Sequence, residues 1–372
     1  MSRVGLICAV LAAAAIGAVV IGLDEKDGPE AAPMNPIAEP SAVEGLSARQ
    51  LAGQRIVCGF DGQRTPQSLL RVVERGELAG VILFADNVRS KAQVARLSGA
   101  LQATARPEGL RQPVIVSVDQ EGGLVKRLPG PPKTSAAAMG ARGPEFARRQ
   151  GEATGTSLSA AGVNIDLAPV LDVARPGGFI AEQRRGFGGK PGRVATVGTA
   201  FAEGLQSAGV AATAKHFPGL GSTDDNTDLR PASIPLKAGV LRSVDERPYR
   251  AFASAGGKLV MVSSARYPAL GTGKLPASQS RRVTTGELRG RLGFTGVSIT
   301  DSLETPAARS GSTTAKVAVR AAAAGSDVLL YVHCDAALRA STALRRALHS
   351  GKLDSARFEA AVGRVLALRA SL

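Results

Sequence analysis

The clearest indication of the fold is the stretch Gly209-Val210-Ala211-Ala212-Thr213-Ala214-Lys215-His216-Phe217-Pro218-Gly219. Its first six residues form a small, apolar run, which is typical of a parallel strand buried on both faces. A buried strand rarely ends in a cation and an imidazole, because a buried charge needs a partner. Three acids, Asp224, Asp225 and Asp228, follow in the loop. We therefore expect a functional site at the carboxyl end of this strand; the alternative is a capped strand end with a solvated loop.

Short, apolar, β-branched runs of this kind recur along the chain. The predicted strands are Arg55–Phe60, Gly80–Phe84, Pro113–Val118, Val163–Val170, Val210–Ala214, Lys258–Ser263, Gly296–Thr300 and Asp327–Val332. Stretches with helical spacing are interspersed with them at Pro66–Glu74, Lys91–Ala103, Glu145–Ala161, Arg193–Ala208, Val244–Ala255 and Thr314–Ala324, and an amphipathic helix is predicted over Ser355–Leu372. Eight such units predict an α/β fold, a single-domain (β/α)8 TIM-type barrel, with a doubly wound open sheet as the alternative.

In a barrel of this type the active site lies at the carboxyl ends of the strands. The residues at these ends are Asp86-Asn87, Asp119-Gln120-Glu121, Asp172, Lys215-His216, Ser263-Ser264 and Asp301-Ser302. A single carboxylate at a strand end is often only a helix cap, but together these residues predict a polar, partly anionic cup. The sequence has no glycine-rich phosphate loop after its first predicted strand.

The first 45 residues differ in composition from the rest. Val4–Leu23 is an apolar run preceded by Arg3 and followed by acids, and twenty helical residues cover about 30 Å, the thickness of a bilayer core. Residues 1–23 are interpreted as a cleaved signal peptide or an uncleaved membrane anchor, with a buried core helix as the alternative. Residues 24–45 read as a flexible linker, and residues 46–372 as the barrel. We expect the barrel to be extracytoplasmic, either secreted or held at the membrane through residues 4–23.

The charge of the chain suggests an anionic environment. The formal net charge is +15, and because residues 1–45 contain two bases and six acids, residues 46–372 carry +19. A basic exported domain suits an anionic cell wall, although many of these charges are expected on solvated helix faces. Nucleic acid is not expected as a partner, since the sequence has neither a recognition-helix pattern nor basic residues interleaved with aromatic ones.

The cysteines do not indicate a metal site. Cys8 lies in the apolar run, and neither Cys58 nor Cys334 has the spacing of a zinc ligand. Export would permit a disulfide between Cys58 and Cys334, but two buried free thiols are an equal alternative.

Five motifs together resemble glycoside hydrolase family 3. They lie at residues 118–127, 167–172, 185–188, 215–219 and 293–301, and their order and spacing hold over residues 46–372. The chain looks most similar to the single-domain β-N-acetylhexosaminidases that remove N-acetylglucosamine from cell-wall fragments. The resemblance implies a carbohydrate substrate with no metal or organic cofactor. It also implies that Asp301 is the nucleophile and that the sugar hydroxyls are held by Asp119, Arg127, Arg185, Lys215 and His216.

The residue chemistry agrees with these roles. A retaining glycosidase needs an ionised carboxylate below the anomeric carbon, and a lysine in the same cup should favour the charged form of Asp301. Carboxylates and arginines are suited to bidentate hydrogen bonds with sugar hydroxyls. The alternative role for Asp301 is the cap of the following helix.

One loop departs from the pattern of those hexosaminidases. They carry K-H-F-P-G-H-G-D-T-x-x-D-S-H, in which the last Asp and His act together as general acid and base. Here the corresponding residues are Asn226 and Asp228, and Leu220 and Ser222 also differ. The other histidines of the domain, His333 and His349, lie elsewhere in the sequence.

Three interpretations of the missing Asp-His pair stay open. Asp228 serves directly as the acid, or Asp224 or Asp225 reaches in, or the barrel only binds saccharides. Ser302 and Ser264 are further departures from the family pattern, so the preferred substrate, terminal β-linked N-acetylglucosamine of cell-wall or chitin-type saccharides, has a β-glucoside or β-xyloside as its alternative.

Overall fold

The computed structural model describes residues 43–372, so the predicted leader and nearly all of the predicted linker lie outside the described residues. Within residues 43–372 no helix is both long enough and apolar enough to span a bilayer. The main sheet contains eight parallel strands in the spatial order β10 (Leu329–Tyr331), β1 (Ile56–Cys58), β2 (Gly80–Leu83), β3 (Ile115–Val118), β6 (Ile165–Asp166), β7 (Ala211–Phe217), β8 (Leu259–Val262) and β9 (Val297–Thr300).

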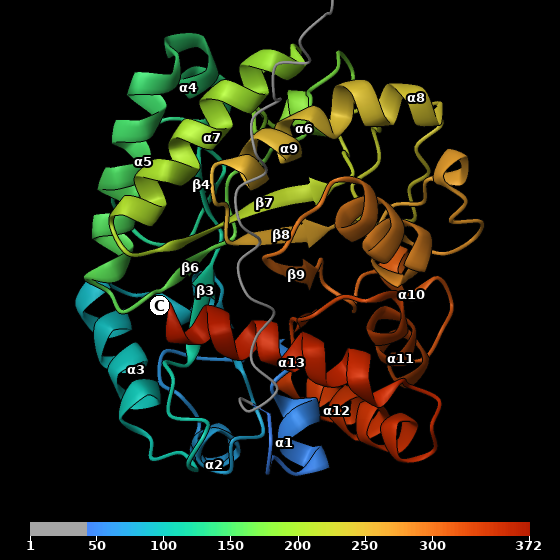
Figure 1. Cartoon of the computed structure of the whole chain (residues 1–372). Helices are drawn as coiled ribbons and strands as arrows, with labels where there is room; N and C mark the ends of the chain where they lie inside the picture. Colours follow the sequence, from blue (N-terminus) through green and yellow to red (C-terminus); the bar gives the residue numbers. More distant parts are fainter. Residues whose placement is uncertain (1–42) are drawn as a thin grey trace, which may run out of the picture. The chain divides into compact units, whose positions relative to one another are not determined.

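The sheet closes into a barrel where β9 meets the start of β10. Ile299 and Val328 form a parallel bridge there, and the Leu303 N–H donates to the Leu330 carbonyl at 3.0 Å. The (β/α)8 prediction is therefore confirmed, and the open-sheet alternative is wrong. Each predicted strand overlaps one observed strand. Figure 1 shows the helices arranged around these strands, with α5 (Pro144–Ser159) beside α7 (Pro191–Ser207).

The other α-helices, in chain order, are α1 (Ala48–Gly53), α2 (Gln67–Glu74), α3 (Lys91–Ala103), α4 (Ala136–Arg142), α6 (Phe179–Glu182), α8 (Ala238–Val240), α9 (Arg247–Ser254), α10 (Pro306–Arg309), α11 (Thr314–Ala324), α12 (Cys334–His349) and α13 (Ser355–Ala370). A small hairpin, β4 (Gln120–Gly122) with β5 (Val125–Lys126), extends from the end of β3.

Two strand lengths differ from the prediction. β7 continues to Phe217, three residues beyond its predicted end, because Lys215 finds carboxylate partners and can stay in a buried strand. β6 covers only Ile165–Asp166, although pairing resumes at the bridge between Val170 and Lys215.

The barrel interior is filled by alternate strand residues. Val57, Ile82 and Leu259 belong to one buried cluster, and Val365 and Leu368 of α13 join it. The Arg369 guanidinium on the same helix donates to the carbonyls of residues 112 and 113, just before β3, at 2.7 and 2.9 Å. Helix α13 therefore covers the amino ends of the strands and leaves the carboxyl ends open.

A buried carboxylate also holds the amino ends together. Asp327 precedes β10 and is fully buried. It accepts hydrogen bonds from Arg364 at 2.7 Å, from the Ser298 N–H at 2.8 Å and from Arg289. Burial alone would raise the pKa of Asp327, but Arg289 and Arg364 lower it below its ordinary value. This network lies at the end of the barrel opposite the predicted site.

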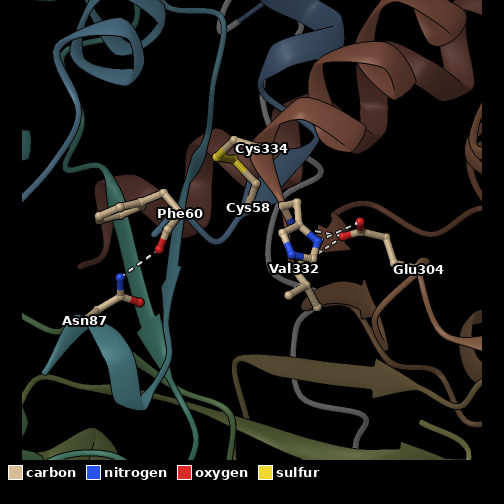
Figure 2. The surroundings of a disulfide bond; sticks show 7 residues. Cys58, Phe60, Asn87, Glu304, Val332 and Cys334 are labelled. Carbon is tan, nitrogen blue, oxygen red and sulfur yellow. Dashed lines mark hydrogen bonds and ion pairs between the residues drawn. A yellow bond between two sulfur atoms is a disulfide. The ribbon is translucent and has the colours of Figure 1, made fainter. Parts of the chain in front are cut away.

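The two cysteines of the domain form a disulfide. Cys58 is the last residue of β1 and Cys334 the first of α12, with their Cα atoms 5.0 Å apart. The bond therefore joins the first strand of the barrel to the chain that leaves its last strand (Figure 2). This settles the alternative between a disulfide and two free thiols.

Candidate active site

A cavity of about 460 Å³ opens at the carboxyl ends of the strands. Its lining includes all seven predicted site residues, namely Asp119, Arg127, Arg185, Lys215, His216, Asp228 and Asp301. They come from the end of β3, the β4–β5 hairpin region, the loop after α6, strand β7 and the loop after it, and the end of β9. Residues more than 180 positions apart in the sequence thus share one site, as the barrel topology requires.

Lys215 lies at the centre of the charged cluster. Its Nζ is 2.6 Å from Asp119 Oδ1 and 2.6 Å from Glu121 Oε1. Burial alone would lower the pKa of Lys215, but the two carboxylates raise it above its ordinary value. Arg127 Nη2 lies 3.8 Å from the other oxygen of Asp119. Asp119 therefore faces the cavity between two cations.

Glu121 is a site residue that the sequence analysis did not assign. Arg185 donates to both of its oxygens at 2.8 Å in a bidentate pair. Burial would raise the pKa of Glu121, but Arg185 and Lys215 lower it to about 2. The signal was the carboxylate two residues after Asp119, because residues two apart on an extended backbone point to the same face. Glu121 fixes the two cations that the resemblance assigns to the sugar.

His216 is oriented by a carboxylate below the cavity. Its Nδ1 lies 2.8 Å from Asp172 Oδ2, and Asp172 Oδ1 accepts from the backbone N–H groups of His216 and Leu220 at 3.1 and 2.7 Å. Because a carboxylate only accepts, Nδ1 carries the hydrogen and Nε2 stays available at the cavity. Asp172 was expected in the cup; it is instead fully buried and does not line the cavity.

Asp301 follows β9, and one of its oxygens accepts the N–H of Ser302 at 2.8 Å. Its pKa is raised to about 6, chiefly by burial and next by the charge of Asp228. Lys215 favours the charged form of Asp301, as expected, but burial and the charge of Asp228 outweigh it. Lys215 is already paired with Asp119 and Glu121, and it opposes the rise only weakly.

The acids of the loop after β7 differ in their placement. Asp228 lines the cavity, and its N–H donates to Asn226 Oδ1 at 2.9 Å, which sets the turn. Asp225 is paired with Arg230 instead, and neither Asp224 nor Asp225 lines the cavity.

The strand-end pairs Asp86-Asn87 and Ser263-Ser264 do not line the cavity either. Asp86 is exposed and does not line it. Asn87 is used to hold the loop after β1, donating to the Phe60 carbonyl at 2.7 Å (Figure 2). Only some of the polar strand-end residues predicted for the cup therefore line the cavity.

A third buried carboxyl adjoins the cluster. Asp166, at the end of β6, is fully buried and accepts from the Gln120 N–H at 2.9 Å. Burial raises the pKa of Asp166 to about 8, although the Gln120 N–H and Lys215 act against the rise. Burial therefore favours the neutral form of Asp166 beside the charged cluster.

Two residues at the cavity rim were not anticipated as site residues. Glu304, from the loop after β9, and His333, from the loop after β10, both line the cavity. His333 lies far from the Asp228 loop in sequence, and only barrel closure brings it to the same site. Across residues 43–372, no group of three or more histidine, cysteine, aspartate or glutamate side chains is placed to hold a metal ion.

The chain resembles known proteins over nearly its whole described length. The family model for the glycosyl hydrolase family 3 N terminal domain matches residues 48–368. An uncharacterized secreted glycosyl hydrolase of Arthroderma benhamiae is 37% identical over 343 residues, covering 90% of this chain and 96% of that protein. A beta-hexosaminidase of Xanthomonas axonopodis pv. citri is 36% identical over 270 residues, covering 70% of this chain and 78% of the other.

Solved structures show the same likeness. A glycoside hydrolase family 3 beta-N-acetylglucosaminidase from a Paenibacillus species superposes with a TM-score of 0.82 at 36% identity, covering 88% of this chain. The match spans only 63% of that longer protein. A beta-N-acetylhexosaminidase from Beutenbergia cavernae superposes with a TM-score of 0.80 at 30% identity, covering 87% of this chain and 98% of the other.

Proposed function

The chain belongs to glycoside hydrolase family 3 and is a glycoside hydrolase of the β-N-acetylhexosaminidase-like type, and from this premise we propose that it removes terminal β-linked N-acetylglucosamine from cell-wall or chitin-type saccharides with retention of configuration. The observation that carries the proposal is that two carboxyl groups, Asp301 after β9 and Asp228 in the loop after β7, line the same cavity. Two carboxyl groups that act on one glycosidic bond are what a retaining mechanism needs.

The two carboxyl groups have different roles in this mechanism. Ionised Asp301 attacks the anomeric carbon and forms a glycosyl ester, while Asp228 gives its proton to the departing glycosidic oxygen. A water molecule then attacks the anomeric carbon, Asp228 takes a proton of that water, and the bond from this carbon to the Asp301 carboxylate breaks. Because Asp301 must be ionised and burial raises its pKa to about 6, the first step should become efficient above that pH.

The terminal sugar would occupy the buried end of the cavity. Asp119 and Lys215 offer an acceptor and a donor there, and His216 offers its free Nε2. Arg127 lines the same end. Arg185 contributes as well, but its bidentate pair with Glu121 makes it chiefly a support for the cluster.

We place the enzyme outside the cytoplasm. The leader with Arg3 and the run Val4–Leu23 supports export. So does the Cys58–Cys334 disulfide, since such bonds persist in oxidising compartments. The Arthroderma benhamiae relative carries the description secreted. The +19 charge of residues 46–372 would keep the barrel near an anionic cell wall, with the membrane reached only through residues 4–23.

A panel of aryl β-glycosides tests the sugar preference with the purified chain from residue 46. N-acetylglucosaminide should be the best substrate, and faster cleavage of the glucoside or xyloside would move the assignment to those enzymes. Asp301→Ala should abolish turnover in a folded protein, and a mechanism-based fluorosugar should label Asp301. Near-wild-type turnover by Asp301→Ala, or a label on another acid, would refute the nucleophile.

Asp228→Ala tests the proton donor. Saccharides with poor leaving groups should lose about 10²–10⁴-fold in rate, whereas an activated aryl glycoside should form the glycosyl ester and then stall. Azide should restore turnover and give the β-glycosyl azide. Asp224→Ala is the matched control from the same loop and should keep wild-type rates. If Asp224→Ala shows the loss instead, the role passes to that residue; a wild-type protein that binds these saccharides and cleaves none is a binding barrel.

The location is tested separately. Protease added to intact, wall-stripped host cells should digest the barrel, and full protection would contradict export.

A further inference from the structure

The rim of the cavity carries a carboxylate–imidazole pair outside the mechanism above. Glu304 Oε1 lies 3.1 Å from His333 Nδ1, and its other oxygen accepts the N–H groups of Val332 and His333 at 2.5 and 2.9 Å. Figure 2 shows Glu304 directed at this backbone. Since the carboxylate only accepts, Nδ1 of His333 carries a hydrogen and Nε2 is left for another partner.

The backbone under this pair is fixed from two sides. Leu330, three residues before His333, is in the ladder of β10, where its N–H bonds to Thr300 Oγ1 at 3.1 Å. Cys334, the next residue, is bonded to Cys58 of β1. The His333 side chain, 64% exposed, is thereby held on a rigid backbone and not on a free loop. Preorganisation of this kind lowers the entropy cost of binding a ligand.

Depth in the cavity separates this pair from the residues assigned to the terminal sugar. Lys215 and His216 are only 2% and 6% exposed, whereas the side chains of Glu304 and His333 are 21% and 64% exposed. An enzyme that holds a terminal sugar at the closed end of a cavity directs the leaving group toward the opening. The rim pair therefore faces the next sugar along the chain.

We propose that His333, oriented by Glu304, binds the leaving-group sugar and sets the preference of the enzyme for saccharides over simple glycosides. His333 Nε2 accepts a hydrogen bond from a hydroxyl of that sugar, and the flat face of the imidazole packs against its ring. The proposal rests on the proposed function, and it makes His333 a specificity residue while the proton donor stays Asp228. One hydrogen bond of this kind contributes about 0.5–1.5 kcal/mol.

Three substrates with the same terminal N-acetylglucosamine test it. They are the dinitrophenyl glycoside, the methyl glycoside and the β-1,4-linked disaccharide. For His333→Ala, the ratio of kcat/KM for the disaccharide to kcat/KM for the methyl glycoside should fall about three- to tenfold. His333→Gln, which places an amide near the position of Nε2, should recover part of this ratio. His349→Ala, an exposed histidine at the other end of α12, is the matched control and should keep the wild-type ratio.

Two results would overturn the proposal. An unchanged ratio in His333→Ala would show that the residue does not contact the second sugar. Equal losses with the methyl glycoside and the disaccharide, but not with the dinitrophenyl glycoside, would make His333 a proton donor instead.

Binding measurements test the contact between His333 and the second sugar independently of whether the protein cleaves the saccharide. In an Asp301→Ala background, His333→Ala should weaken the binding of the disaccharide more than that of N-acetylglucosamine, even if the wild-type protein cleaves neither. Equal weakening of both, or of neither, refutes the second-sugar contact.

Discussion

Glu121 offers the most direct test of how the site is held together. It lies 3% exposed between Lys215 and Arg185, and it supplies their shared negative charge. Replacing it with glutamine keeps the shape of the side chain and removes that charge. Both cations then stay buried, Lys215 with only Asp119 as an ion-pair partner among the described residues.

The magnitude follows from the pKa of the carboxyl. Burial opposes ionisation of Glu121, yet the two cations lower the pKa from 4.5 to about 2. At about 1.36 kcal/mol for each pKa unit, this favours the charged form by about 3 kcal/mol in the folded state. Glutamine resembles the protonated acid, so we expect Glu121→Gln to lower the free energy of unfolding by about 3 kcal/mol at pH 7.

The pH dependence has a definite sign. A carboxyl whose pKa is lowered on folding stabilises the protein above its unfolded pKa, and this contribution is lost as the pH falls through the folded value. The difference between wild type and Glu121→Gln should therefore be constant above about pH 4.5. Below that pH it should shrink by about 1.4 kcal/mol for each pH unit, toward zero near pH 2.

Urea unfolding at pH 7 and at pH 3.5 measures both quantities. Glu145→Gln removes a carboxylate from an exposed pair with Arg148 and should leave the unfolding free energy close to wild type. A Glu121→Gln protein as stable as wild type at pH 7 would refute the reasoning. So would a difference that is the same at both pH values.

Three further predictions concern other carboxyl groups. The rate of labelling by the fluorosugar should fall below about pH 6 as Asp301 becomes protonated. Asp228→Asn should shift this fall in the labelling rate to lower pH, because it removes a like charge. An unchanged pH profile would show that the two groups do not interact. The stability of Asp166→Asn relative to wild type should rise by about 1.4 kcal/mol for each pH unit between about 4 and 8. The reason is that the raised pKa of Asp166 stabilises the wild-type fold at low pH, and this stabilisation is lost as the pH rises. Wild type and variant whose stabilities change in parallel with pH in thermal unfolding would contradict the prediction. Asp327→Ala should cost about 3–5 kcal/mol, because it removes the fully buried partner of the half-buried Arg289 and Arg364. A loss below about 1 kcal/mol in urea unfolding would show that the two arginines find other partners.

The barrel and the shared site could be predicted from the sequence because both follow from local patterns. Buried parallel strands show as short apolar runs, and polar residues after those runs must meet at one end of a closed barrel. The bounds of α3 and α11 agree with the prediction, and each helix begins after a capping side chain, Ser90 for α3 and Thr313 for α11.

What the sequence did not predict depends mostly on which side chains pair. Helix α12 was not among the predicted helices, although its buried residues, mostly alanines, share one face. Asp172 and Glu121 look like Asp301 in the sequence, and only the structure shows that the first two are committed to His216 and to Arg185. The conformation of the loop after β7 places Asp228 in the cavity and Asp225 beside Arg230. Residue types alone do not predict such a loop conformation.

The bond between Cys58 and Cys334 has a consequence for how the chain is made. Its partners are 276 residues apart, so a chain emerging from its N-terminus exposes the first cysteine long before the second exists. Oxidation can only follow completion of almost the entire polypeptide, and until then β1 lacks its neighbour β10. Once formed, the bond closes the chain between the two cysteines into a ring, which in the chain-entropy description disfavours unfolding by about 5.6 kcal/mol. After a single proteolytic cut inside that ring, the two fragments would stay covalently joined until a reductant cleaves the disulfide.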